Sequence, residues 1–403
     1  MGTSNLDSLE VNQMRIVFIT DWFAEKMGYA ENCLPKAMAS LGHEVHVITS
    51  NVQPYFNSPV YKETYEPFIG PGIVACGVKE IDGYTLHRLP HIMWKGNLRI
   101  RGLLAKLRAS RPQIVQTFDV LSQTTFEAAL GKLLLGYKLF LESHVHASVF
   151  PLATGRVGAT TVDAKGRVVS LLSEKCYPIS ADAADIAIRF FGVQPNKVSV
   201  CSLGVDTELF RSPTDASSQQ VRVELRHRLG FAESDVVCVY TGRFSEDKDP
   251  LCLAQAISIL VGQDMPFRGL FVGWGPQAEA IQACQGCVVH PFVPFRDLVQ
   301  LYWAADIGVW PRQESTSQLD AAACGLPIVL SNRIKVTERV DGNGLTYEEG
   351  DPHDLARQVS TLCDPQVRCR MGEHGAKKMR EHFSWRHIAE DRTRDYERAW
   401  QGR

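Results

Sequence analysis

The sequence lacks a long apolar run, a strong charge of either sign and a regular cysteine framework. No apolar stretch approaches the roughly 18 residues that cross a bilayer. The formal net charge of -2 creates no field that would recruit nucleic acid. The 11 cysteines have no regular spacing, and Cys284 and Cys287 lack a second pair that would complete a zinc site. We therefore expect reduced thiols in a cytoplasmic protein without a nucleic-acid partner.

The first residues of the sequence predict neither a secretory signal nor a lipid anchor. Residues 1–13 are polar, have no apolar core of a secretory signal peptide, and are expected to be flexible. Leu6 stands where an N-myristoylation signal needs serine or threonine. The composition, 45% hydrophobic and 22% charged, is that of a globular protein, and 403 residues predict two domains.

Short β-rich runs alternate with helical runs along the whole chain. This alternation predicts an α/β fold with parallel sheets, which bind ligands beyond the carboxyl ends of their strands. The Gly-, Thr- and Ala-rich segment 147–176 precedes a fresh β-run, so a domain boundary is expected near residue 177. The run KVSVCSL at 197–203 is interpreted as a strand of the second domain.

The clearest candidate site is a basic loop that begins at Gly242. Glycine permits a sharp exit from the preceding β-run, and Asp249 and Pro250 are expected to begin the next helix. Arg243 and Lys248 would then flank a loop at a strand's carboxyl end. The two cations suit a diphosphate, because guanidinium clamps oxygens while ammonium acts as a point charge. Two solvated surface charges are the alternative.

A second candidate site is a polar turn that leads into a short helix. Ser315 or Ser317 can cap this helix, which Gly325 ends, and unpaired amides at a helix start bind anions. Asp320 is placed to accept hydrogen bonds from ribose hydroxyls, and Glu314 from those of a sugar. A capped surface helix with incidental acids is the alternative.

A loose GxGxxA pattern begins at Gly273 and includes Gly275. It raises the possibility of dinucleotide binding. Pro276 directly after the second glycine is atypical, and no ribose-binding acid follows at the usual distance. The pattern indicates a tight turn beside a nucleotide, with an NAD-dependent oxidoreductase as the alternative.

Three features of the first half point to a cleft. Gly28 closes the loop after the first β-run, and Pro35 is expected in the first turn of a helix that starts near Asn32. His144 and His146 follow a later β-run, and alternation would point both to the same side. Zinc would need a third ligand. The histidines are expected either to lie in the core or to bind a sugar or acceptor.

The stretch Leu98–Arg111 is basic and amphipathic. It is compatible with peripheral docking on anionic lipid or with binding an acceptor diphosphate. A solvated helix face with its apolar side on a sheet is the alternative.

Together these features resemble glycosyltransferase family 4, the retaining GT-B enzymes, over nearly the whole chain. The resemblance rests on motifs in a matching order: the Gly28 loop, GHEVHVIT (42–49), His144, GVDTELF (204–210), GRFSEDK (242–248), GWGP (273–276), HPFVP (290–294), DAAACGLP (320–327) and FSWRHIAEDRTRDYERAW (383–400). It implies two Rossmann-like domains facing a cleft. The implied ranges are an acceptor domain at 14–177, a donor domain at 178–384 and a helix at 385–403 that crosses back to the first domain.

The resemblance also implies roles for individual residues. The catalytic candidates are His144, Arg243, Lys248 and Glu314. The donor-binding candidates are Gly28, Gly242, Gly273, Gly275, Phe292, Val293, Ser315, Thr316, Ser317 and Asp320. Tyr29 and His146 are the acceptor-side candidates.

The sequence departs from the family pattern in its first loop and in its paired acids. Tyr29 follows Gly28 where the family usually has a second glycine. Asp320 replaces the second glutamate of the pair, and Arg312 stands eight residues before it, where the first glutamate should be. A shortened loop could let Glu314 take over the contact with the donor sugar.

The resemblance implies transfer of a hexosyl group from a nucleotide-sugar, with UDP-sugars favoured, to a hydroxyl of a glycan, lipid-linked or small-molecule acceptor. The reaction would retain anomeric configuration and need neither metal nor cofactor. The alternatives are a nucleotide-sugar epimerase or hydrolase of the same fold, and a non-catalytic module that binds a sugar nucleotide or a partner.

Overall fold

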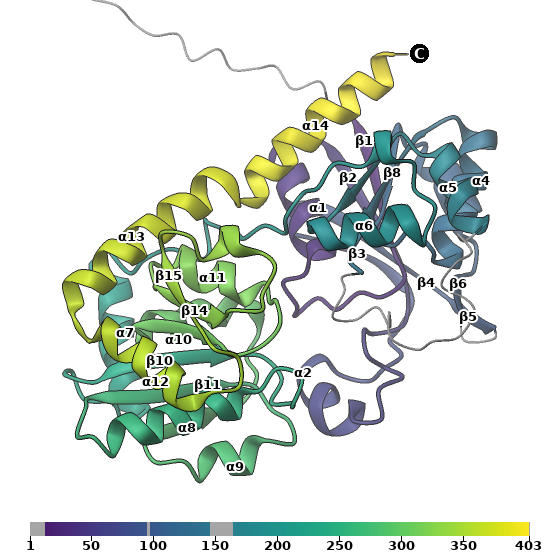
Figure 1. Cartoon of the computed structure of the whole chain (residues 1–403). Helices are drawn as coiled ribbons and strands as arrows, with labels where there is room; N and C mark the ends of the chain where they lie inside the picture. The colour runs from purple at the N-terminus through teal and green to yellow at the C-terminus, as the bar shows by residue number, and fades with distance from the viewer. Residues whose placement is uncertain (1–12, 95–96, 146–163, 403) are drawn as a thin grey trace, which may run out of the picture.

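The computed structural model describes residues 13–94, 97–145 and 164–402. Two parallel-sheet domains lie side by side, with a long carboxy-terminal helical segment running over both (Figure 1). The predictions for residues 1–12 and for His146 fall outside the described residues.

The first domain is built on a seven-stranded sheet of order β3-β4-β2-β1-β7-β8-β9, parallel except at β3. Its strands are β1 (Arg15–Thr20), β2 (Glu44–Ser50), β3 (Gly77–Ile81), β4 (Tyr84–Leu89), β7 (Ile114–Thr117), β8 (Lys138–Ser143) and β9 (Lys175–Pro178), and β5 (His91–Trp94) and β6 (Asn97–Ile100) form a separate hairpin. Side chains of β1 alternate between two cores, Ile16 and Phe18 on one face and Val17 and Ile19 on the other. Helices therefore cover both faces.

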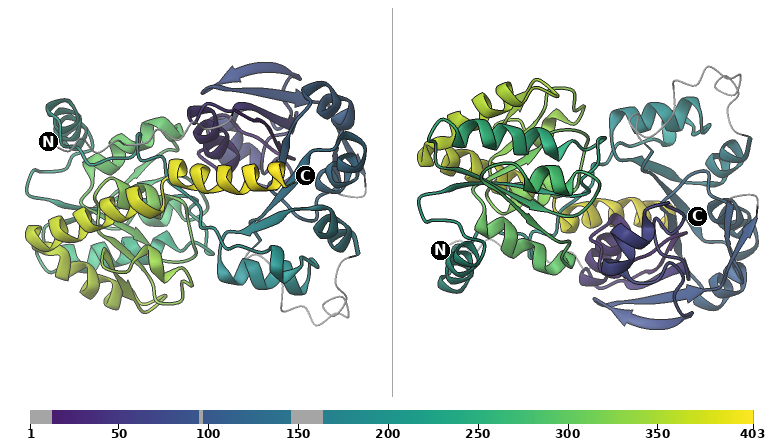
Figure 2. Two further views of the ribbon diagram at one scale, coloured as in Figure 1. Left: turned by 90° about the horizontal axis from the view of Figure 1, so that it is seen from above. Right: turned by 90° about the horizontal axis from the view of Figure 1, so that it is seen from below.

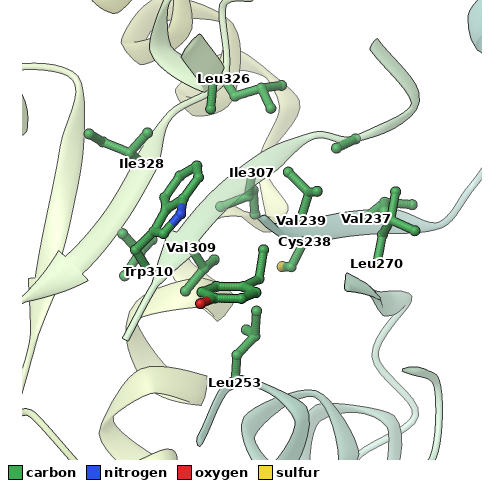
Figure 3. Close-up of a cluster of buried hydrophobic side chains, with 14 of the residues drawn as sticks. Val237, Cys238, Val239, Leu253, Leu270, Ile307, Val309, Trp310, Leu326 and Ile328 are labelled. Atoms are coloured by element: carbon green, nitrogen blue, oxygen red, sulfur yellow. The ribbon is translucent and has the colours of Figure 1, made fainter. Parts of the chain in front are cut away.

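The second domain has a six-stranded, all-parallel sheet of order β12-β11-β10-β13-β14-β15. Its strands are β10 (Val236–Thr241), β11 (Phe267–Val272), β12 (Cys287–His290), β13 (Ile307–Trp310), β14 (Ile328–Ser331) and β15 (Gly344–Tyr347). Val239 of β10, Val309 and Trp310 of β13 and Leu253 of helix α8 (Pro250–Val261) pack in one buried cluster (Figure 3). Every residue of β10 is buried, because helices cover both faces of the sheet. This explains why the strand is a continuous apolar run instead of an alternating one.

The helices connect successive strands and cover the sheets. In the first domain they are α1 (Ala30–Ser40), α2 (Glu66–Ile69), α3 (Leu103–Ser110), α4 (Gln123–Leu135), α5 (Ala164–Leu172) and α6 (Ala181–Arg189). The others are α7 (Ala216–Arg228), α8 (Pro250–Val261), α9 (Ala278–Gln282), α10 (Leu298–Ala304), α11 (Ser317–Ala323), α12 (Pro352–Ser360), α13 (Pro365–His382) and α14 (Trp385–Gln401).

Helix α14 belongs to the first domain although it ends the chain. It continues from α13 on the second domain and crosses to lie along α1 (Figures 1 and 2). Ile388, Ala389 and Tyr396 enter the core that contains Ile16 and Phe18 of β1. The crossing helix therefore joins the two domains through buried apolar contact.

The structure corrects the predicted domain boundary at residue 177. Strand β9 completes the first sheet, and α6 beyond it packs on β8 and β9, with Ile186 and Ala187 in the core of the first domain. Segment 197–203 forms no strand; only Val198 bridges Cys176 of β9. Because the apolar face of α6 is buried against the first sheet, this helix belongs to the first domain. The second sheet begins only at β10.

Two local predictions also need correction. Helix α1 begins at Ala30 instead of near Asn32, so Pro35 lies inside the helix, beyond its first turn. Leu98–Arg111 forms strand β6, a turn and helix α3, not one amphipathic element. Leu98, Leu103 and Leu107 are buried in the core, so they are not available to enter a lipid surface.

Within the described ranges, no helix combines the length and apolar character needed to span a membrane.

Candidate active site

A cavity of about 730 Å³ lies between the two domains, and residues of both line it. The first domain contributes the loop after β1, the start of α1, part of segment 54–68 and His144. The second contributes the loops after β10, β12 and β13. Parallel strands place these loops together at their carboxyl edges, as expected for α/β ligand sites.

The basic loop after β10 forms one wall of the cavity. Gly242 has φ 148°, and its N–H donates to the carbonyl of Val272 at 3.0 Å. Arg243 and Lys248 both line the cavity, and the Lys248 ammonium donates to the backbone carbonyl of Glu314 at 3.2 Å. Asp249 does not cap α8 as expected: its backbone is left-handed, with φ 51°, and its side chain makes no capping hydrogen bond.

The ammonium of Lys248 is poised to lose its charge in mildly alkaline solution. Burial and the nearby Arg243 guanidinium lower its pKa from 10.5 to about 8. A Lys248 that is charged below this value and neutral above it should bind a diphosphate more weakly as pH rises.

We expect the Kd for a diphosphate ligand to rise above pH 8 by up to about tenfold per pH unit, because one proton is then taken up on binding. Calorimetric titration with UDP, GDP and ADP between pH 7 and 10 would measure this slope. The matched control is Lys248→Arg, whose cation does not titrate in this range. An equally steep slope in the arginine variant would show that another group titrates.

The GWGP turn (273–276) packs against the backbone of the basic loop. Gly273 and Gly275 have φ 149° and 155°, outside the range that a side chain readily adopts. A Cβ on Gly273 would lie 1.8 Å from the carbonyl oxygen of Gly242, and one on Gly275 2.6 Å from that of Phe244. Neither glycine lines the cavity. They allow the close backbone approach that holds the loop of Arg243.

The turn before α11 lies beside the basic loop, because it follows β13, the neighbour of β10 in the sheet. Ser315, Thr316 and Ser317 line the cavity. The Ser315 hydroxyl accepts from the N–H of Ser317 at 3.3 Å, while the N-cap residue is Thr316, whose side chain makes no cap bond. Asp320 lines the cavity at 4% exposure, and burial, together with the charge of Asp206, raises its pKa well above the usual value. A protonated Asp320 can donate as well as accept hydrogen bonds.

Glu314 and Arg312 occupy different surroundings. The Arg312 guanidinium donates to the carbonyl of Glu246 at 3.1 Å and lies 3.6 Å from the Glu349 carboxylate, and Arg312 does not line the cavity. Glu314 does line it, and its carboxylate accepts from the Lys335 N–H at 3.4 Å. The shortened loop therefore places Glu314, two residues after Arg312, at the cavity.

Arg339 is a cavity residue that the sequence analysis missed. Its guanidinium donates to the Ser315 carbonyl and to Gln318 Oε1, both at 3.1 Å, while its buried Nε has no hydrogen-bond partner. It stands just beyond β14, in a segment that matches none of the motifs considered above. Three cations, Arg339 with Arg243 and Lys248, thus surround this half of the cavity.

The first domain meets the second at Gly28. A Cβ there would lie 2.0 Å from the ring of Phe295, and the Phe295 N–H donates to the carbonyl of Lys26 at 3.2 Å. Tyr29 lines the cavity, and its hydroxyl lies 3.0 Å from that of Tyr55. The predicted donor-side residues Phe292 and Val293, after β12, line the cavity as well.

His144 is held by a chain of buried polar groups. Its Nε2 lies 2.7 Å from Glu142 Oε2, and the other Glu142 oxygen pairs with Arg392 of α14 at 2.6 Å. Gln116 donates to Glu142 at 3.0 Å and accepts from Arg392 at 3.0 Å. The Arg392 guanidinium lies 3.7 Å from the centre of the Tyr177 ring. Arg392 of the crossing helix is thus connected to the cavity through the side chains of Glu142 and His144.

These buried polar groups determine the charge on His144. Burial alone would raise the pKa of Glu142, but Arg392 and His144 hold it below its usual range. Burial opposes the charged form of His144 as well, yet the hydrogen bond and charge of Glu142 raise its pKa. His144 therefore presents an imidazole whose Nε2 donates to Glu142.

Two family models match the sequence, one on each domain. Glycosyltransferase Family 4 matches residues 34–209, and Glycosyl transferases group 1 matches residues 235–364. The chain belongs to glycosyltransferase family 4. This family 4 protein is 27% identical to D-inositol 3-phosphate glycosyltransferase 1 of Catenulispora acidiphila, over 64% of the chain and 65% of that protein. It is 31% identical to a D-inositol 3-phosphate glycosyltransferase of Jonesia denitrificans, over 52% of the chain and 53% of that protein. The matches span between half and two thirds of these relatives.

Solved structures share the whole architecture of this family 4 protein. A glycosyltransferase from Rickettsia africae superimposes with a TM-score of 0.69 at 13% identity, over 97% of this chain and 99% of that one. Anabaena HepE in complex with UDP gives 0.67 at 18% identity, over 94% and 98%. The predicted GT-B fold is confirmed.

Proposed function

We propose that the protein is a glycosyltransferase that moves a hexosyl group from a nucleotide-sugar to a hydroxyl-bearing acceptor, with retention of anomeric configuration. The observation that carries the proposal is the convergence of Arg243, Lys248 and the turn before α11 on one interdomain cavity. UDP-sugars are the favoured donors, because HepE, a structure of the same fold, is described in complex with UDP and with UDP-glucose.

In the proposed reaction the donor diphosphate lies against Arg243 and Lys248. The negative charge that develops on it as the glycosidic bond breaks is stabilised by cations that are already in place. Because these groups supply positive charge, we expect the reaction to need no divalent metal. His144 faces the same cavity from the first domain, where its imidazole can orient a hydroxyl of the sugar or acceptor. Exclusion of water from the cavity would favour transfer over hydrolysis.

The test is to incubate the protein with UDP-, GDP- and ADP-sugars, with and without EDTA, and to follow nucleoside diphosphate release by mass. A mixture of potential acceptors is added in parallel, and the anomeric configuration of each product is read by NMR. We expect EDTA-insensitive release from one class of donor and a product of retained configuration. An isomerised nucleotide-sugar would instead identify an epimerase. The absence of both binding and release would favour a non-catalytic module.

A further inference from the structure

Two cysteines lie at the ends of one tight turn in the second domain. Cys284 follows helix α9, and Cys287 begins strand β12. The Cys287 N–H donates to the carbonyl of Cys284 at 3.3 Å, which closes a β-turn whose first and last Cα atoms lie within about 7 Å. Gly286, with φ 79°, supplies the left-handed residue of this turn. Disulfides join Cα atoms about 4.4–6.8 Å apart, so the turn brings the two backbones to about the separation that a disulfide bridges.

The two thiols share one environment. Both cysteines are partly buried and pack against the core of the second domain. Cys284 Sγ donates to the carbonyl of Ala280 in α9 at 3.4 Å, and Cys287 Sγ donates to that of Ala254 in α8 at 3.7 Å. Helices α8 and α9 pack against each other. Burial, with a further contribution from the nearby Cys284, raises the pKa of the Cys287 thiol to about 12. The two sulfur atoms therefore lie close enough for their charges to interact.

Metal binding does not account for this pair of cysteines. Within the described ranges, no three His, Cys, Asp or Glu side chains gather in a way that could hold a metal ion. Both thiols are free in the structure. No other two of the 11 cysteines are fewer than six residues apart in the sequence. Two neighbouring free thiols without further metal ligands are suited to thiol–disulfide exchange.

We propose that Cys284 and Cys287 form a reversible disulfide site, which is oxidised by exchange with a small disulfide such as oxidised glutathione. The Cys284 thiolate attacks one sulfur of the small disulfide and releases one thiol. The Cys287 thiolate then attacks Cys284 Sγ in the mixed disulfide and releases the second thiol. In total the two protein thiols lose two electrons and two protons, and the small disulfide is reduced to two thiols. Attack begins at Cys284, because burial disfavours the thiolate of Cys287.

The disulfide would close the turn at the start of β12, the edge strand of the second sheet. Strand β12 ends at His290, whose carbonyl accepts from the N–H of Gly273 at 2.9 Å. Phe292 and Val293, which line the cavity, follow two and three residues later. The oxidised turn would therefore restrain the strand that leads to the second-domain side of the cavity.

The test incubates the full chain in mixtures of reduced and oxidised glutathione, quenches with acid and alkylates the remaining thiols in denaturant. The tryptic peptide 269–296, which contains Cys284 and Cys287 and no other cysteine, is then read by mass. As oxidised glutathione increases, we expect an unalkylated peptide that is two hydrogen atoms lighter than the dithiol, and excess reduced glutathione should restore both alkylation sites. A peptide that stays fully alkylated, or that carries only a glutathione adduct, would overturn the proposal. The test needs no turnover of a nucleotide-sugar, so its outcome is independent of the proposed function.

Two variants test the order of attack. In Cys287→Ser the mixed disulfide on Cys284 cannot be resolved, so a glutathione adduct should accumulate there. In Cys284→Ser the adduct on Cys287 should be at least about tenfold less abundant, because its thiolate is disfavoured. The exposed Cys76, alone in its tryptic peptide 63–79, is the control and should form only the adduct in the parent and in both variants. Equal adducts on Cys284 and Cys287 would refute the order of attack, and a disulfide from either variant to another cysteine of the chain would refute the pairing.

Discussion

Replacing Arg243 with alanine is expected to lower kcat by about 10² to 10³, or about 2.7–4 kcal/mol of transition-state stabilisation. The guanidinium lines the cavity at the end of β10, where the leaving diphosphate is proposed to lie. Charge builds up on that group only as the glycosidic bond breaks. The loss should therefore appear more strongly in kcat than in the KM for the donor. Steady-state kinetics with the donor found in the panel would measure both.

The chain offers a matched control for this substitution. Arg243 pairs with Asp247, four residues later in the loop, at 3.3 Å, and Arg189 pairs with Asp185, four residues earlier, at 2.7 Å. Arg189 lies on α6 with its side chain 70% exposed. Arg189→Ala should leave kcat within about twofold, because exposed pairs of this kind contribute little. Equal activity in Arg243→Ala and Arg189→Ala would refute a role for Arg243 in stabilising the leaving group.

The sequence could predict which loops meet in the second domain. Strands β10 and β13 pair in parallel, so the loops that follow them leave the same edge of the sheet. Arg243, Lys248 and Ser315 were predicted from this local pattern, and all three line the cavity. Hydrophobic runs and turn residues carry this information, because they determine where each strand ends.

The sequence could not predict contacts that depend on how distant elements pack. Arg392 lies in α14, 276 residues after the Gln116 side chain that it contacts. Arg339 follows β14 in a segment without a motif, and only the fold brings it to Ser315. The domain boundary was misplaced for the same reason. The apolar face of α6 fits either sheet by pattern, and tertiary packing assigns it to the first.

Replacing Arg392 with methionine is expected to destabilise the protein by about 3–5 kcal/mol. The substitution leaves the Glu142 carboxylate, only 3% exposed, without its strongest partner. Urea unfolding of the parent protein and of Arg392→Met would measure the loss in the free energy of unfolding. Arg392→Met combined with Glu142→Gln should recover most of the stability, because an amide needs no counter-ion and can still hydrogen-bond Gln116. Similar instability in the double variant would show that Arg392 acts by packing alone.

The same double variant separates folding from the control of His144. In the parent protein the Glu142 carboxylate raises the pKa of His144 above its usual 6.5. Without that carboxylate, burial favours the neutral ring, and the nearby Glu31 is the carboxyl that still favours the charged form. The His144 ring signal in NMR, assigned by its loss in His144→Gln, should therefore titrate at lower pH in the double variant than in the parent. Glu142→Gln alone should shift it in the same direction. A stably folded double variant with an unmoved titration would mean that α14 supports the first domain without setting the charge of the cavity histidine.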